Sequence, residues 1–350
     1  MPAQPLYLDH AATTPLLPAA RDAWLEGAAI WANPSSPHRQ GRSARAALEE
    51  ARARIAGVLG WDGEIVFTSG ASEALAIAIG RVRSRLAAVS PVEHEAVLRH
   101  AGAVERLPVD GFGRVEITAG AALSGLVAVQ QVNSETGIVQ PLAQIAAAVR
   151  ECGGVLLADC AQGAGKLALP DADLIALAAH KFGGPVGVGA LLVRDWALLE
   201  PSGGQERGYR AGTENLPGIM AMAAALEAGS EWLPEASRLR TALESGIVAA
   251  GGEVIAGEAE RCPTIGGYRM PGTSSAAQLI RFDAMGIAVS AGSACSSGSL
   301  KTSHVLAAMG MDAKAASEVI RVSIGRETSE ADIARFLEAW RSIAGKRAAA

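Results

Sequence analysis

Lys181 is the residue whose surroundings most favour covalent chemistry. It follows the apolar run 174–179 and precedes a glycine-rich turn at 183–189. The run has the length and content of a buried strand. The sequence therefore predicts that Lys181 lies just beyond a strand's carboxyl end, where open α/β sheets keep their ligands. An amine held near apolar walls has a lowered pKa and can attack a carbonyl group to form a Schiff base. A solvated lysine at a strand end is the alternative.

Cys295 is the second reactive candidate. It lies in the segment 290–299, which consists almost entirely of small residues. Structural cysteines are usually buried among apolar neighbours, which Cys295 lacks, so the pattern favours an exposed thiol. The other cysteines, Cys152, Cys160 and Cys262, show neither a CxxC spacing nor a Cys/His ligand pattern. We therefore expect no disulfide framework and no metal site.

Alternating strand-like and helical stretches must position these residues. Strand-like runs lie at 64–67, 86–90, 126–132, 155–158, 174–179 and 190–193. Helical patterns lie at 18–30, 38–59, 74–85, 142–149, 216–232 and 234–249. Such alternation implies right-handed crossovers and a mostly parallel sheet, so the polar residues that follow the strands should converge on one rim.

The turn at 68–73 (TSGASE) joins a strand to a helix through small residues. Backbone N–H groups at such a helix start are free to receive a phosphate. The spacing matches neither a Walker nor a dinucleotide motif. An ordinary helix start capped by serine or glycine is therefore the alternative.

The converging polar residues complement a flat, phosphorylated pyridine aldehyde, pyridoxal phosphate. Asp159 could keep the ring nitrogen protonated, which makes the ring the electron sink that this cofactor needs. Gln162 or Asn133 could hydrogen-bond the ring hydroxyl, and His94 could lie on the ring face. Near the C-terminus, Arg321 lies in a strand-like run and could grip a carboxylate bidentately. An ordinary structural ion pair is the alternative for that arginine.

Composition and length limit the fold class, the number of domains and the kinds of partner that we expect. The 350 residues are 49% hydrophobic and 19% charged, which predicts an α/β protein with one large and one smaller domain. We expect residues 15–250 to form the large domain, and residues 1–14 and 251–350 the smaller one. The net charge of -5 comes without a basic stripe, so neither nucleic acid nor an anionic membrane is an expected partner. The start lacks the features of a signal peptide, so the cytoplasm is the expected location.

In their order along the chain, the motifs resemble those of the cysteine desulfurases, pyridoxal-phosphate enzymes of the class V aminotransferase group. The motifs are YLDHAATTP, NPSSPH, FTSGASE, EHEAVL, VNSETG, DCAQGAGK, HKFGGPVGVGAL, ERGYRAGT, SAGSACSSGS and IRVSIGR. The resemblance implies the type I fold of pyridoxal-phosphate-dependent transferases. In that fold a large domain with a mostly parallel sheet flanked by helices is joined to a smaller α+β domain. The short segment around Cys295 resembles the subgroup that supplies sulfur to iron–sulfur cluster assembly.

The resemblance also implies roles for the residues around the cofactor ring. Lys181 would hold the cofactor and act as general base and acid. His94 would stack on the ring, Asp159 would pair with the pyridine nitrogen, and Gln162 would contact the ring oxygen. Asn133 would be a further cofactor contact, although the family usually has a second asparagine where this chain has Ser134.

Further roles concern the phosphate, the substrate and the sulfur. The phosphate would be bound by Ala71, Ser72 and His180, and by Thr213 from the neighbouring subunit of a homodimer. The serine that is common two residues before His180 is Ala178 here, which removes one phosphate contact. Arg321, helped by Asn33, would hold the substrate carboxylate, and Cys295 would be the nucleophile.

The implied reaction converts L-cysteine to L-alanine and leaves the sulfur on Cys295 as a persulfide. A sulfur-acceptor protein, such as an iron–sulfur scaffold, would then receive it. A selenocysteine lyase and another class V aminotransferase are alternatives within the same group. A non-catalytic sulfur-relay or assembly subunit is the alternative of a different kind.

Overall fold

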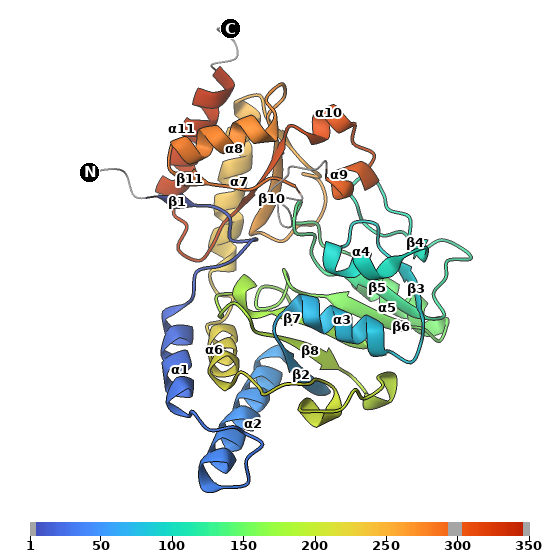
Figure 1. Ribbon diagram of the computed structural model, residues 1–350. Coiled ribbons are helices and arrows are strands. Elements are labelled where there is room, and N and C mark those ends of the chain that lie inside the picture. Colours follow the sequence, from blue (N-terminus) through green and yellow to red (C-terminus); the bar gives the residue numbers. More distant parts are fainter. Residues whose placement is uncertain (1–4, 293–302, 346–350) are drawn as a thin grey trace.

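The computed structural model describes residues 5–292 and 303–345. Figure 1 shows a large unit built on a sheet with helices on both faces, and a smaller unit that carries both ends of the chain. Within the described residues, none of the helices has the length and apolar content needed to span a membrane.

Seven strands form the main sheet in the order β2-β8-β7-β6-β5-β3-β4. Their bounds are β2 Glu64–Thr68, β3 Leu86–Val89, β4 Glu105–Arg106, β5 Leu126–Gln130, β6 Val155–Asp159, β7 Leu174–Ala178 and β8 Gly189–Val193. The pairs from β7 to β4 are parallel, whereas β8 is antiparallel to both β7 and β2. β8 reverses because the connection 179–188 is too short for a crossover helix. The expected mostly parallel sheet is confirmed, with one reversed strand.

Helices cover both faces of this sheet. On one face lie α1 Pro18–Ala29, α2 Arg39–Leu59, α5 Leu142–Glu151 and α6 Leu216–Glu227, and on the other α3 Ala71–Arg81 and α4 Glu95–Ala101. β5 is buried on both sides, because Val127 and Val129 pack into the first layer while Leu126 and Ala128 pack into the second. Full burial of a valine or leucine contributes roughly 1.5–3 kcal/mol. This two-sided burial explains why β5 reads as an unbroken apolar run.

The ends of α2 and α3 show how local signals set helix bounds. α2 begins after His38, whose side chain caps it, and ends at Gly60, which takes a left-handed φ of 62°. α3 starts directly after Gly70, whose φ of 152° only glycine adopts readily, and so begins before the expected residue 74. It ends before the expected residue 85 because Val82 is extended.

The smaller unit contains a three-stranded antiparallel sheet in the order β12-β10-β9. Its elements are β9 Glu253–Val254, β10 Ile265–Arg269 and β12 Val319–Ser323, with helices α7 Leu233–Ala249, α8 Ser275–Ala284, α9 His304–Ala308, α10 Ala313–Ala316 and α11 Glu330–Gly345. The rings of Phe282 and Phe336 stack at 5.0 Å in its core, beside Trp340. α7 also packs into this core, although we expected the large domain to run to residue 250. The packing favours a boundary near residue 230, and the division into domains stays a proposal.

The N-terminal segment connects the two units. β1 (Leu6–Tyr7) pairs in parallel with β11 (Ile287–Ala288) of the smaller unit. Asp9 then bridges to Ser323 of β12. Farther along, the N–H of Thr14 donates to the carbonyl of His180 at 2.8 Å. The segment therefore runs from the smaller unit to the turn that carries Lys181.

Candidate active site

A cavity of about 560 Å³ lies where the carboxyl ends of the parallel strands face the smaller unit. Its volume is in the usual range for small-molecule sites. Eight of the residues singled out from the sequence line it: Ala71, Ser72, His94, Asp159, Gln162, His180, Lys181 and Arg321. The convergence expected from the strand ends is therefore present in the fold.

Lys181 ends the 3-10 turn η1 (Ala179–Lys181), which follows β7 directly. Its Nζ donates hydrogen bonds to the carbonyl oxygens of Ala11 at 2.7 Å and Ala12 at 2.8 Å. The following turn is tight, because a Cβ at Gly184 would lie 2.8 Å from the Cβ of Ala179. The N-terminal segment and this glycine turn together hold the amine at the cavity wall.

Asp159 and Glu93 are two of the three buried carboxyl groups that line the cavity, with Glu135 the third. Burial raises the pKa of Asp159, while a hydrogen bond from the Ala161 N–H and the charges of His94 and Lys181 oppose this rise. Burial raises the pKa of Glu93 well above its ordinary range, and the charge of Asp159 raises it further. Because two neighbouring carboxylates repel each other, ionisation of both at once is disfavoured, and the stronger upward shift of pKa falls on Glu93.

Burial favours the neutral form of two of the histidines that line the cavity, His94 and His180. His94 is the N-cap of α4, and its Nδ1 accepts a hydrogen bond from the N–H of Ala96 at 3.1 Å. Burial lowers the pKa of His94, so its single proton resides on Nε2. Burial and the charge of Lys181 lower the pKa of His180 to about 4. Each ring can therefore donate a hydrogen bond without adding a positive charge.

The N-terminus of α3 opens on the cavity through Gly70, Ala71 and Ser72. The first N–H groups of a helix lack intrahelical partners and bind anions. Gly70 makes no side-chain cap and leaves these groups accessible. Gly189 of β8 must also lack a side chain, because its Cβ would lie 2.6 Å from the Cα of Gly70. β8 and α3 thus form a close-fitting cradle for a phosphate.

Gln162 contributes an acceptor that the described residues leave unpaired. Its Nε2 donates to the carbonyl oxygen of Ala11 at 2.8 Å. Its Oε1 is buried and has no hydrogen-bond partner in the described part of the chain. A buried acceptor without a partner costs about 1–3 kcal/mol. A ligand hydroxyl at this position would remove that cost.

Arg321 lies buried in β12 and lines the cavity from the smaller unit. It donates to Oδ1 of Asp9 at 2.6 Å and to the carbonyl oxygen of Ser134 at 3.1 Å. Its Nε is buried and has no partner among the described residues. Arg321 therefore makes the structural ion pair that is the alternative interpretation, and its Nε leaves one donor toward the cavity, so the binding of a carboxylate ligand stays a prediction.

The structure does not bring Asn133 into the cavity. Its Oδ1 accepts from the N–H groups of Glu135 at 2.9 Å and Thr136 at 3.0 Å, and its Nδ2 donates to the carbonyl of Val92 at 3.1 Å. These bonds close a turn and engage both the oxygen and the nitrogen of the amide. Ser134 lines the cavity instead. Asn133 shapes this turn, and its expected contact with the cofactor stays a prediction.

Three other predicted residues are not part of the cavity wall as described. Asn33 is exposed, and its Oδ1 accepts from the N–H of Ser35 at 2.8 Å. Thr213 is exposed in the loop before α6. Cys295 lies outside the described residues, but Gly292 before it and His304 after it both line the cavity.

The remaining cysteines differ sharply in their surroundings. Cys160 and Cys262 are buried, and Cys152 is exposed. Burial raises the pKa of Cys160 well above its ordinary value, and the charges of Asp159 and Glu93 raise it further. A thiol held in its neutral form is a poor nucleophile, so Cys160 is a packing residue beneath the site.

Sequence reasoning missed four residues that shape the cavity. They are Glu93, Glu135, Ser303 and His304. Ser303 donates to Oε2 of Glu135 at 2.5 Å, and Nε2 of His304 lies 2.9 Å from the carbonyl oxygen of Glu93. These contacts join the start of α9 to the large unit. The signal was the SHVL sequence directly after the cysteine segment, which places a histidine close to a candidate nucleophile along the chain.

Comparisons with known proteins agree with this geometry. The model of the aminotransferase class-V family matches residues 6–336. The chain is 40% identical to a cysteine desulfurase of Cereibacter sphaeroides, over 95% of this chain and 94% of that protein. A NifS-like protein of known structure superposes with a TM-score of 0.89 at 30% identity, over 98% of this chain and 100% of that one. The structure of SspA in complex with cysteine superposes with a TM-score of 0.78 at 27% identity, over 93% and 100% of the two chains.

Proposed function

The chain belongs to the class-V aminotransferase family, and we propose that it is a cysteine desulfurase that uses pyridoxal 5'-phosphate. It converts L-cysteine to L-alanine and transfers the sulfur to Cys295 as a persulfide. One observation carries the proposal: Lys181, Asp159 and Arg321 line the same cavity as the N-terminus of α3. An amine nucleophile, a carboxylate, a carboxylate-binding guanidinium and a phosphate cradle are the groups that this chemistry needs.

The residues of the cavity fit this cofactor. The free N–H groups of α3 suit its phosphate, and the unpaired Oε1 of Gln162 suits its ring hydroxyl. Asp159 offers an ionised carboxylate to a protonated ring nitrogen. When bound at Lys181, the cofactor supplies an electron sink for the negative charge that develops on the substrate carbons.

The side chains of this protein orient the substrate and move its protons. Arg321 holds the substrate carboxylate and thereby directs the Cα–H bond toward Lys181. The amine of Lys181 takes the Cα proton and later returns a proton to the carbon skeleton. The ring of His94 lines the cavity, where it would cover one face of the bound ring and keep water from it.

Sulfur transfer is the step assigned to Cys295. Its thiolate attacks the sulfur of the bound cysteine, so that an S–S bond forms as the Cβ–S bond breaks. The electron pair of the broken bond remains with the carbon skeleton, which is protonated and leaves as alanine. The sulfur stays on the protein as a persulfide, and no external oxidant is required. Cys295 is three residues along the chain from Gly292, which lines the cavity.

Alanine and sulfide released from L-cysteine, with a thiol reductant present, test this assignment. We expect equimolar products from the wild-type protein, and almost none from a Cys295→Ala variant that still binds the cofactor. Cys160→Ala is the matched control and should keep its activity. A Cys295→Ala variant as active as the wild type would overturn the role of Cys295. A wild-type protein that fails to bind the cofactor would instead support the sulfur-relay alternative.

Reaction rates with different substrates distinguish the proposed function from the alternatives within the family. The known structure of a relative, SspA, is a complex with cysteine, which supports cysteine as the substrate class here. Release of alanine from L-cysteine and from L-selenocysteine under the same conditions distinguishes a desulfurase from a selenocysteine lyase. Transfer of the amino group to a keto acid, without release of sulfide, would identify an ordinary aminotransferase.

A homodimer is the assembly that we propose. Leu16 and Val186 are 43% and 72% exposed, and the N–H of Leu17 donates to the carbonyl oxygen of Gly183 at 2.9 Å. Exposed apolar side chains on such adjoining segments are typical of protein interfaces. A dimer would also allow Thr213 and Asn33 to contribute to the site of the neighbouring subunit. Sedimentation equilibrium tests the assembly.

We further propose a cytoplasmic location and delivery of the sulfur to an acceptor protein such as an iron–sulfur scaffold. The support is the resemblance of the segment around Cys295 to that of desulfurases which serve such scaffolds. Transfer of radiolabelled sulfur from the persulfide to a purified scaffold protein tests the delivery. Label that remains entirely on the desulfurase would point to another acceptor.

A further inference from the structure

The phosphate cradle contains a carboxylate of its own. Glu73 lies in the first turn of α3 and lines the cavity with Gly70, Ala71 and Ser72. Its Oε2 accepts a hydrogen bond from the N–H of Ser69 at 2.5 Å. A carboxylate is stabilised at a helix N-terminus, but it repels a phosphate dianion that binds to the neighbouring N–H groups of Ala71 and Ser72. The cradle therefore needs a cation that neutralises Glu73.

Arg210 meets this need. Its Nε donates to Oε1 of Glu73 at 3.1 Å, and its side chain is only 20% exposed. Among the described residues, Arg210 is the one basic side chain in an ion pair with Glu73. Burial favours the neutral form of Glu73, but the hydrogen bonds from Ser69 and Arg210 hold its pKa below the ordinary value. The two oxygens of Glu73 are thus shared between the turn and the arginine.

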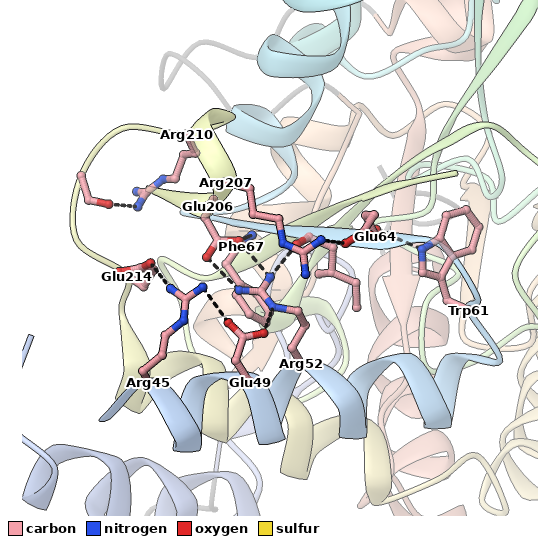
Figure 2. A network of polar contacts seen from close by, with 12 residues as sticks. Arg45, Glu49, Arg52, Trp61, Glu64, Phe67, Glu206, Arg207, Arg210 and Glu214 are labelled. Atoms are coloured by element: carbon pink, nitrogen blue, oxygen red, sulfur yellow. Dashed lines mark hydrogen bonds and ion pairs between the residues drawn. The ribbon is translucent and has the colours of Figure 1, made fainter. Parts of the chain in front are cut away.

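The loop that carries Arg210 is anchored by a buried carboxylate, Glu206, which Figure 2 shows between Arg52 and the backbone of Phe67. Glu206 accepts from Nη1 and Nη2 of Arg52 at 2.9 and 3.0 Å, and from the N–H of Phe67 at 2.9 Å. Glu206 and Arg207 have φ values of 47° and 55°, which are unfavourable for residues other than glycine. Such backbone persists only where side chains hold it, so the loop presents Arg210 from a rigid support. Phe67 lies in β2, directly before the phosphate turn. Glu206 therefore anchors both the loop that carries Arg210 and the turn that leads to Glu73.

We propose that Arg210 is a positioning residue for the cofactor phosphate, because it neutralises Glu73 and keeps that carboxylate away from the N–H groups of Ala71 and Ser72. The proposal rests on the proposed function, since the phosphate is that of pyridoxal 5'-phosphate. Without Arg210, Glu73 repels the phosphate or itself occupies the free N–H groups. The loss is confined to ligands that carry the phosphate, because the ring-binding residues lie elsewhere in the cavity.

Binding of two ligands to the cofactor-free protein tests this proposal. Pyridoxal 5'-phosphate and pyridoxal share the ring and the aldehyde and differ only in the phosphate. Each is titrated into the wild type, Arg210→Met, Glu73→Gln and the double variant, and binding is followed by the absorbance of the bound ring. Arg207→Met is the matched control, because Arg207 lies in the same loop but pairs with Glu64 at 2.6 Å instead of Glu73.

We expect Arg210→Met to raise the dissociation constant of pyridoxal 5'-phosphate about tenfold, which corresponds to about 1.4 kcal/mol, and to leave that of pyridoxal unchanged. Glu73→Gln removes the repulsive charge and keeps an acceptor for the Ser69 N–H. The double variant should therefore bind the phosphorylated ligand nearly as tightly as the wild type. Arg207→Met should bind both ligands as the wild type does.

Three results would overturn the proposal. Equal weakening of both ligands by Arg210→Met would show that the arginine only supports the fold. A double variant as weak as Arg210→Met would show that Glu73 is not the group through which it acts. Unchanged binding in Arg210→Met would show that the ion pair has no effect on the cradle. A wild-type protein that binds neither ligand would instead refute the proposed function, so the two failures are distinct.

Discussion

Replacement of Glu206 by glutamine should destabilise the folded protein far more than the same replacement of Glu227. Glu206 accepts two hydrogen bonds from Arg52 of α2, at 2.9 and 3.0 Å. Glu227 accepts two from Arg54 of the same helix, at 2.7 and 2.6 Å. The pairs thus share chemistry and helix, but the side chain of Glu206 is 1% exposed and that of Glu227 is 37% exposed.

Burial sets the expected size of the two effects. Removal of one partner of a buried ion pair typically costs about 3–5 kcal/mol. Arg52 is 13% exposed and keeps a second partner, Glu49, at 3.1 Å. We therefore expect Glu206→Gln to lower the free energy of unfolding by about 2–4 kcal/mol. An exposed pair contributes about 0–1 kcal/mol, which is the expected loss for Glu227→Gln.

Urea unfolding of the cofactor-free protein, followed by circular dichroism, measures both changes through the midpoint and the slope of the transition. A double variant, Arg52→Met with Glu206→Met, removes both charges of the pair. It therefore shows whether the loss in Glu206→Gln comes from the uncompensated charge of Arg52 or from lost packing. It should recover most of the stability, because a buried pair replaced by apolar side chains is often neutral. A midpoint shift for Glu206→Gln no larger than that for Glu227→Gln would refute the reasoning.

Acid should destabilise the protein through His10, whose pKa burial and the charge of Lys166 lower from 6.5 to about 4. Because the unfolded chain binds this proton more readily, the free energy of unfolding should fall as the pH drops from 6.5 to about 4. In His10→Gln it should fall less steeply with pH. Urea unfolding at each pH measures both proteins, and the same dependence on pH in the two would contradict this. Gly189→Ala should lower the thermal midpoint, because its Cβ would clash with the carbonyl oxygen of Leu177. Gly80→Ala in α3, where a Cβ would meet no atom within 4 Å, should raise stability by about 0.5–1 kcal/mol. Equal thermal midpoints for the two variants would show that the cradle relaxes. His94→Ala removes the cap of α4 and should cost about 1 kcal/mol as well as cofactor affinity. His94→Asn keeps a capping oxygen and should recover the stability alone, so a variant that recovers neither in thermal unfolding would contradict the capping role.

Much of the fold follows from local sequence signals. The fold class, cofactor class and enzyme class that the motifs implied are confirmed by the sheet and by the comparisons. The bounds of α2 followed from its apolar spacing and from Gly60, because both signals are local. The reversal of β8 depends on the length of one connection, which periodicity does not report. The placement of α7 depends on which of two cores it meets, and that is decided by tertiary packing.

The site was predictable where strand ends alone bring residues together. Asp159 and Lys181 follow neighbouring parallel strands, so their convergence needed only the order of the elements. Asn133 also follows a strand, but its amide oxygen accepts hydrogen bonds from the N–H groups of its own turn. Residue type reveals the capacity to hydrogen-bond and does not reveal which partners take it. Glu93 was missed because an acidic residue beside a histidine looks like an ordinary solvated charge until its burial is known.

Residues 9–12 show why a motif without reactive side chains can belong to an active site. The side chain of Asp9 pairs with Arg321, which binds the substrate carboxylate in the proposed function. Two and three residues later, the carbonyl oxygens of Ala11 and Ala12 hold the amine of Lys181, which moves the substrate proton in the proposed function. So short a segment spans at most about 3.6 Å per residue, and it therefore limits the separation of the two groups. In the proposed function, the Asp9 side chain and the carbonyl oxygens of Ala11 and Ala12 thus position the groups that act on both ends of the substrate.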